Sequence, residues 1–115
     1  MEIKELQDLV CKFRDARNWK QFHNGKDMAL SLSLEAAELL ELTQWKSEQE
    51  VKEAFKNDSG LLADELADVL YWVLLIARDF DVDLGEALKA KIRKNETKYP
   101  VDLARDSKQK YLDLE

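Results

Sequence analysis

The sequence of 115 residues contains one cysteine, Cys11, and one histidine, His23. A lone cysteine excludes a disulfide within the chain and a zinc site built from several cysteines. A lone histidine excludes a metal site that needs two histidines from one chain, and a Ser-His-Asp site unless His23 itself takes part. There is no apolar run near the roughly 20 residues of a membrane-spanning helix, and no signal-peptide pattern. We therefore expect a protein of the reducing cytoplasm without a membrane partner.

Glycine and proline are also scarce, with three glycines and one proline. Few turn signals and no alternating strand pattern predict a small number of long helices. The length allows one hydrophobic core, so a single domain over 1–115 is expected. Lysine and arginine number 18 against 24 aspartates and glutamates, a net charge of −6. This balance argues against nucleic acid as a partner, because phosphate backbones attract a basic face.

Apolar residues recur at helical spacing in four stretches, separated by turn signals. Asn24-Gly25 separates the first stretch from the second, Asp27 is the expected N-cap of the second helix, and Asp83 is that of the fourth. Pro100 ends the fourth helix, because proline disfavours a helical conformation at the residue before it. The expected helices cover about 2–17, 27–45, 61–80 and 84–98, with a short helical turn near 50–55.

Four helices with mostly short connections predict an all-α, four-helix-bundle-like fold. The helix expected over 27–45 is apolar around most of its circumference, and such a helix is buried on more than one side. Three other helices of similar length can cover it only in part. We therefore expect a homo-oligomer in which a second copy covers the rest.

Two pairs of carboxylates interrupt the apolar stripes of two of these helices. Each pair is spaced three residues apart, which places its members on one helix face. Removing an unpaired carboxylate from water costs several kcal/mol, and four close together repel one another. Protonation would relieve that cost, and so would a hard divalent cation such as Mg²⁺, with Mn²⁺ as an alternative. The predicted metal ligands are Glu35, Glu38, Glu65 and Asp68.

Glutamates at this spacing are also common on solvated helix faces, so a single pair would carry little weight. Glu41, Glu48, Glu50 and Glu53 are interpreted as solvated residues of that kind. The four candidate ligands differ because two pairs with equal spacing lie on two different apolar helices.

Cations and aromatic residues suggest a site for phosphate and a nucleobase. Lys91, Asn95 and Lys98 share a helix face from which they can approach phosphate oxygens, although lysines near a helix C-terminus also favour the helix dipole. Bases stack on aromatic rings for about 1–3 kcal/mol each. The alternative for each ring is a place in the core or in an oligomer interface. The candidates for base contacts are Trp19, Phe22, His23, Trp45 and Trp72, and further candidates for phosphate contacts are Arg105, Lys108 and Lys110.

Several segments together carry a pattern of known proteins. They are Arg17-Asn18-Trp19-Lys20-Gln21-Phe22-His23, Ser33 to Glu41 with Gln44-Trp45-Lys46, Asp64 to Leu70, and Lys91-x-x-x-Asn95-x-x-Lys98-Tyr99-Pro100. This pattern resembles the MazG-like all-α nucleotide pyrophosphohydrolases. The first segment, Gln44-Trp45-Lys46 and the tail over 103–111 are most similar to the dCTP pyrophosphatase group. The resemblance spans roughly residues 5–112.

The resemblance implies a single MazG-like domain and a Mg²⁺-dependent enzyme of nucleotide-pool sanitation. Such an enzyme cleaves a nucleoside triphosphate, here dCTP or a modified dCTP, between the α and β phosphates and releases pyrophosphate. The family resemblance also implies dimers or tetramers, with a pocket bordered by more than one subunit. One position departs from the pattern, because Trp72 stands where relatives often have tyrosine. That change leaves the base and sugar preference open.

Glu38 is the preferred candidate for the base that orients or deprotonates the attacking water, and Glu35 is the second catalytic candidate. Spacing does not decide between the carboxylates. Two alternatives stay open: a broad-specificity nucleotide pyrophosphatase, and a non-catalytic helical interaction module whose acidic core holds a structural ion or protonated carboxylates. A ferritin-like di-iron site is set aside, because it usually needs two Glu-x-x-His motifs and the chain has none.

Overall fold

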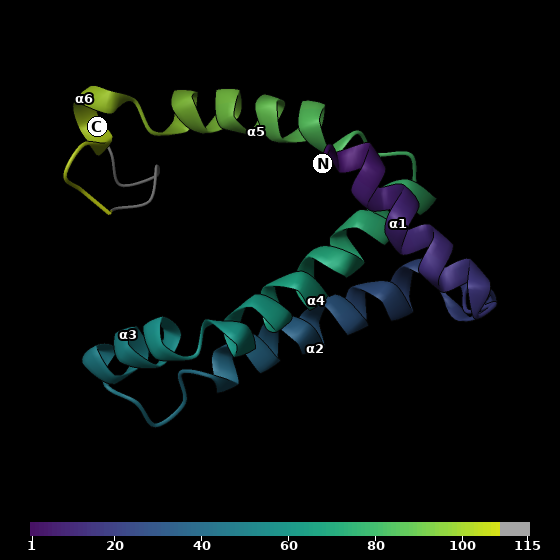
Figure 1. Ribbon diagram of the computed structural model, residues 1–115. Helices are drawn as coiled ribbons and strands as arrows, with labels where there is room; N and C mark the ends of the chain where they lie inside the picture. Colours follow the sequence, from purple (N-terminus) through teal and green to yellow (C-terminus); the bar gives the residue numbers. More distant parts are fainter. Residues whose placement is uncertain (109–115) are drawn as a thin grey trace. The chain divides into compact units, whose positions relative to one another are not determined.

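The computed structural model describes residues 1–108, which form six α-helices and one short 3₁₀ helix, with no strand among them (Figure 1). The prediction of an all-α fold is therefore confirmed. No helix in this part of the chain combines the length and the apolar character needed to cross a membrane. The helices are α1 (Ile3–Ala16), the 3₁₀ helix η1 (Lys20–Phe22), α2 (Gly25–Glu41), α3 (Glu48–Asn57), α4 (Ser59–Asp79), α5 (Leu84–Lys98) and α6 (Val101–Ala104).

The second helix begins earlier than the sequence pattern predicted. Asn24 is its N-cap: the side-chain oxygen accepts a hydrogen bond from the backbone N–H of Asp27 at 2.8 Å, and the side-chain amide donates to the Asp27 carboxylate at 2.9 Å. A side chain that accepts from this N–H satisfies one of the unpaired donors of the first turn. The expectation of Asp27 as N-cap is therefore wrong. The helix also ends at Glu41, and Trp45 adopts a left-handed φ of 64° beyond it.

The polar stretch after α2 holds a longer helix than expected. Ser47 and Glu50 form a capping box, in which the Glu50 N–H donates to Ser47 Oγ at 3.2 Å and the Ser47 N–H donates to the Glu50 carboxylate at 3.0 Å. Serine followed by glutamate three residues later is a helix-start signal. It gives α3 a stable first turn, and the helix extends to Asn57.

The chain divides into two compact units, Met1–Asp81 and the part from Val82 onward. In the first unit α2 and α4 lie side by side in opposite directions, while α1 and α3 also pack on α4 (Figure 1). The buried apolar side chains of the described residues are Met28 at the start of α2 and three residues in the last turns of α4, namely Leu74, Leu75 and Ala77.

The second unit comprises α5 and α6. Asp83 is the N-cap of α5 as predicted, because its side chain accepts a hydrogen bond from the Glu86 N–H at 3.0 Å. The predicted span of this helix, Leu84–Lys98, is confirmed, and Pro100 precedes the short helix α6. Of the tail cations, Arg105 and Lys108 are exposed, whereas Lys110 lies outside the described residues.

Candidate metal and nucleotide site

The two predicted carboxylate pairs meet where α2 and α4 pack together. One oxygen from each of Glu35, Glu38, Glu65 and Asp68 lies within 4.8 Å of every other. Each pair is spaced three residues apart, so both members of a pair face the neighbouring helix. Since the two helices run in opposite directions side by side, the pairs meet at one level. The structure thus brings together all four residues proposed as metal ligands.

Two oxygens in this acidic cluster are buried without a partner. Glu35 and Glu65 are half-buried, and the Oε2 atom of each is buried and accepts no hydrogen bond, whereas Glu38 and Asp68 are exposed. A buried carboxylate oxygen without a partner costs free energy, because it has lost its water. A hard divalent cation takes carboxylate oxygens as ligands. The donor set and the two unpartnered oxygens therefore fit such an ion.

The protonation of the acidic cluster reflects the same crowding. Burial raises the pKa of Glu35 from 4.5 to about 7, and a hydrogen bond with Glu38 and the negative charge of Asp68 act in the same direction. Burial likewise raises the pKa of Glu65, assisted by the negative charge of Glu38. The metal-free cluster therefore retains part of a proton near neutral pH. Ligation of a cation requires that proton to leave.

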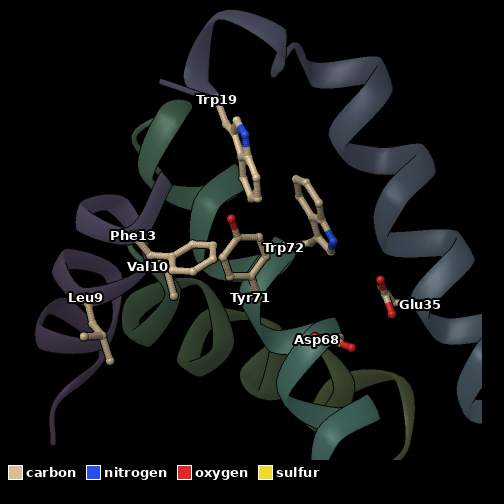
Figure 2. A pocket seen from close by; sticks show the side chains of 8 residues that line it. All are labelled: Leu9, Val10, Phe13, Trp19, Glu35, Asp68, Tyr71 and Trp72. Carbon is tan, nitrogen blue, oxygen red and sulfur yellow. The ribbon is translucent and has the colours of Figure 1, made fainter. Parts of the chain in front are cut away.

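A pocket of about 490 Å³ lies beside the acidic cluster (Figure 2). Figure 2 shows Trp19 at one end of this pocket, with Glu35 and Asp68 at the other. Aromatic and aliphatic side chains from α1 and α4 form the wall between those ends. The complete lining is Leu9, Val10, Phe13, Trp19, Glu35, Asp68, Tyr71 and Trp72.

The aromatic rings of the pocket support one another edge to face. Ring centroids are 5.7 Å apart for Phe13 and Trp19, 6.2 Å for Phe13 and Tyr71, and 5.1 Å for Tyr71 and Trp72. The Tyr71 hydroxyl points toward Trp19 and has no hydrogen-bond partner within residues 1–108 (Figure 2). A pocket with aromatic walls and few polar groups suits a flat ring that stacks and makes a small number of hydrogen bonds.

Of the five residues predicted to bind the base, two line the pocket and three do not. Trp19 and Trp72 line the pocket. His23 meets Trp72 edge to face, with ring centroids 5.1 Å apart, and does not belong to the lining. Phe22 and Trp45 are 65% and 92% exposed and lie outside the lining as well.

The predicted phosphate contacts belong to the second unit, on α5. Lys91 is exposed, while Asn95 and Lys98 are half-buried. Their spacing of four and three residues places them along one side of that helix. Their contact with phosphate stays a prediction.

Four residues of the pocket were not predicted as functional: Leu9, Val10, Phe13 and Tyr71. The first three belong to the apolar stripe of α1, which the sequence pattern assigned to packing. Helical periodicity shows that a face is covered, but it does not distinguish coverage by protein from coverage by a ligand. For these four residues the sequence alone carried no signal that could have separated pocket from core.

These features define a class, namely an all-α protein with a candidate divalent-metal centre at one end of an aromatic pocket. Comparison with known proteins narrows that class. The MazG-like family model matches residues 30–114, which include all four carboxylates. dCTP pyrophosphatase 1 of Rattus norvegicus is 38% identical over 114 residues, covering 97% of this chain and 67% of the relative. Its Homo sapiens counterpart is 35% identical over the same coverage.

A solved structure is similar as well. The crystal structure of a pyrophosphatase from Archaeoglobus fulgidus superimposes with a TM-score of 0.80 at 42% sequence identity, covering 84% of this chain and 91% of that one. The chain belongs to the MazG-like family. The family predicted from the sequence is therefore confirmed.

We predict that Glu35 contributes a loss of stability to the metal-free protein as the pH rises from about 4.5 to about 7. Over this interval Glu35 holds more protons in the folded state than in the unfolded state, so the free energy of unfolding falls as the pH rises. Glu35→Gln should flatten this dependence, measured by urea unfolding in EDTA at several pH values. Glu41→Gln, at an exposed position of the same helix, should keep the wild-type slope. Equal slopes in all three proteins would contradict the prediction.

Proposed function

We propose that this chain hydrolyses a nucleoside triphosphate to the monophosphate and pyrophosphate with the help of a divalent cation. The preferred substrate is dCTP or a modified dCTP, and the role is nucleotide-pool sanitation. The observation that most directly supports this proposal is that four clustered carboxylates lie at one end of a pocket whose other end is aromatic. That polarity matches a substrate with a charged triphosphate and a flat base. The enzyme class itself is confirmed, since relatives are named dCTP pyrophosphatase and pyrophosphatase.

The proposed metal is Mg²⁺, with Mn²⁺ as the alternative. Its ligands are drawn from Glu35, Glu38, Glu65 and Asp68. When bound, such an ion neutralises phosphate oxygens and acidifies water. The Oε2 atoms of Glu35 and Glu65 support this assignment, because they are buried and accept no hydrogen bond within the described residues.

Glu38 is the proposed general base for the water that attacks the α-phosphorus. It is more exposed than Glu35, its partner on α2, so its carboxylate can reach water. Glu35 and Asp68 line the pocket itself and face the triphosphate end of the bound substrate. Trp19 and Trp72 are proposed to stack on the base, with the Tyr71 hydroxyl as a hydrogen-bonding group toward it. Transfer of a proton to a positioned carboxylate typically accelerates such a reaction about 10²- to 10⁴-fold.

The departing pyrophosphate carries negative charge, and its proposed contacts are the cations Lys91 and Lys98 and the neutral hydrogen-bond donor Asn95. Their support is the Lys-x-x-x-Asn-x-x-Lys pattern, which is part of the sequence resemblance to the family. Both units are proposed to act as one MazG-like domain over residues 1–115.

We further propose that the chain forms a homodimer or homotetramer with a four-helix-bundle-like core. Only Met28, Leu74, Leu75 and Ala77 are buried apolar residues within the described chain. Six leucines of α2 and α4 are between 44% and 69% exposed: Leu30, Leu34, Leu40, Leu61, Leu66 and Leu70. Large exposed apolar patches mark interaction surfaces. Phe22 and Trp45, both exposed, are then available to border the pocket of another copy.

Purified protein is expected to release pyrophosphate from dCTP with Mg²⁺ present and to stop in EDTA. Glu38→Gln and Asp68→Asn should each lower kcat about 100-fold or more, because they keep the side-chain size but remove charge and basicity. A coupled pyrophosphate assay measures this. The matched control is Glu41→Gln, which should keep wild-type turnover. Unchanged turnover in both cluster variants would remove the acidic cluster from the mechanism.

dCTP should show a higher kcat/KM than other canonical triphosphates at equal Mg²⁺. Tyr71→Phe should raise the KM for dCTP about 3- to 10-fold, the cost of one neutral hydrogen bond. A flat profile across the triphosphates would favour the broad-specificity alternative. Absence of heat on titration with a non-hydrolysable dCTP analogue would favour the non-catalytic interaction module.

In light scattering after size exclusion, the wild-type protein should have the mass of two or four chains. Leu40→Glu places a charge on a 69% exposed leucine of α2 and should shift the mass toward one chain. Gln44→Glu adds the same charge at an exposed polar position nearby and should leave the mass unchanged. A single-chain mass for the wild type would contradict the oligomer.

A further inference from the structure

A buried ion pair joins α1 to the last turn of α4. Arg14 is 1% exposed and donates two parallel hydrogen bonds to Asp79, from Nη1 to Oδ2 at 2.8 Å and from Nη2 to Oδ1 at 2.9 Å. This two-point geometry is the strong form of an arginine–carboxylate contact. Since a guanidinium is planar and rigid, both of its terminal nitrogens are held in fixed directions.

The same guanidinium reaches the only histidine. Arg14 Nη1 lies 3.4 Å from Nδ1 of His23. A guanidinium has donors and no acceptor, so a hydrogen bond across this distance needs Nδ1 of His23 as the acceptor, which places the ring proton on Nε2. The imidazole is therefore neutral in this arrangement. Burial and the positive charge of Arg14 lower the pKa of His23, which agrees with the neutral ring.

His23 in turn contacts the wall of the pocket. Its ring meets Trp72 edge to face with centroids 5.1 Å apart, and Trp72 meets Tyr71 at 5.1 Å in the same manner. Trp72 and Tyr71 both line the pocket, whereas Arg14, His23 and Asp79 do not. A continuous chain of contacts thus runs from the buried ion pair to the surface proposed to hold the base.

We propose that Arg14 is a positioning residue for the nucleotide pocket: it holds His23 as the Nε2–H tautomer, and His23 in turn fixes the ring of Trp72. His23 then acts behind the wall and not on the substrate. Asp79 neutralises the charge of Arg14 and fixes the orientation of its guanidinium group. The effect on substrate rests on the proposed function of the pocket. Arg14 and His23 lie before the segment that the family model matches.

A second ion pair provides a matched control. Arg78 Nη1 donates to Asp8 Oδ1 at 2.8 Å and joins the same two helices, α1 and α4. Both of its side chains are exposed, and the pair makes no contact with His23. A role confined to helix docking would be shared by the two pairs. A role in positioning His23 belongs to Arg14 and Asp79 alone.

The main variant is Arg14→Met with Asp79→Leu, which removes both charges together. Replacing a buried pair by apolar residues avoids leaving one charge unpaired and is compatible with folding. The control is Asp8→Asn with Arg78→Gln, and circular dichroism verifies helix content in both. We expect the main variant to raise the KM for dCTP about tenfold with kcat within about twofold of the wild type, and the control to keep both parameters. Arg14→Lys should fall between them.

Nitrogen NMR of the imidazole gives a readout independent of turnover, because the chain has one histidine. The wild-type ring should be the Nε2–H tautomer with NOEs to Trp72, and the main variant should show mixed tautomers and weaker NOEs. Unchanged spectra, or altered spectra with an unchanged KM, would overturn the proposal. If the wild type hydrolyses no triphosphate, the proposed function fails. The spectra then decide whether Arg14 positions His23 and Trp72: lost order in the main variant supports it, and unchanged order refutes it.

Discussion

Four carboxylates from two apolar helices each place one oxygen within 4.8 Å of the others, and the rest of the site depends on this crowding. Each charge would be more stable in water, and their mutual repulsion adds to the loss. Burial, with the neighbouring carboxyl groups, raises the pKa of Glu35 to about 7, so the metal-free cluster retains part of a proton near neutral pH. A proton satisfies only one oxygen. The remaining negative charge supports the proposal that the acidic cluster binds a cation together with the phosphates of a substrate.

The helices that create this demand also shape the pocket. The opposite directions of α2 and α4 bring the carboxylate pairs level, and the turn of α4 after Asp68 then carries Tyr71 and Trp72 into the adjoining pocket. Helix α1 lies across that part of α4 and contributes Phe13 and its neighbours. One helix, α4, therefore links the charged end of the pocket to its aromatic end, and a substrate with both characters can span them.

Sequence patterns anticipated what depends on local spacing. The carboxylate pairs and the cap at Asp83 follow from intervals of three residues within one helix, and the structure contains both. The cap at Asp27 was wrong because Asn24 offers a competing oxygen three residues earlier. The pocket residues Val10 and Phe13 could not be separated from core, since periodicity reports a covered face without naming what covers it. Their role depends on how α1 packs against α4, which local spacing does not encode.

The buried guanidinium of Arg14 and the buried carboxylate oxygens of Glu35 and Glu65 differ in whether an opposite charge pairs with them. Arg14 donates two hydrogen bonds to Asp79, and these hydrogen bonds lower the pKa of the Asp79 carboxyl. The oxygens of Glu35 and Glu65 receive no such partner, although both groups lie within one unit of the fold. The buried pair at Arg14 demonstrates that this fold can place a counter-charge where stability requires one. The unpartnered oxygens of Glu35 and Glu65 therefore support the proposal that these carboxylates bind a cation from outside the chain.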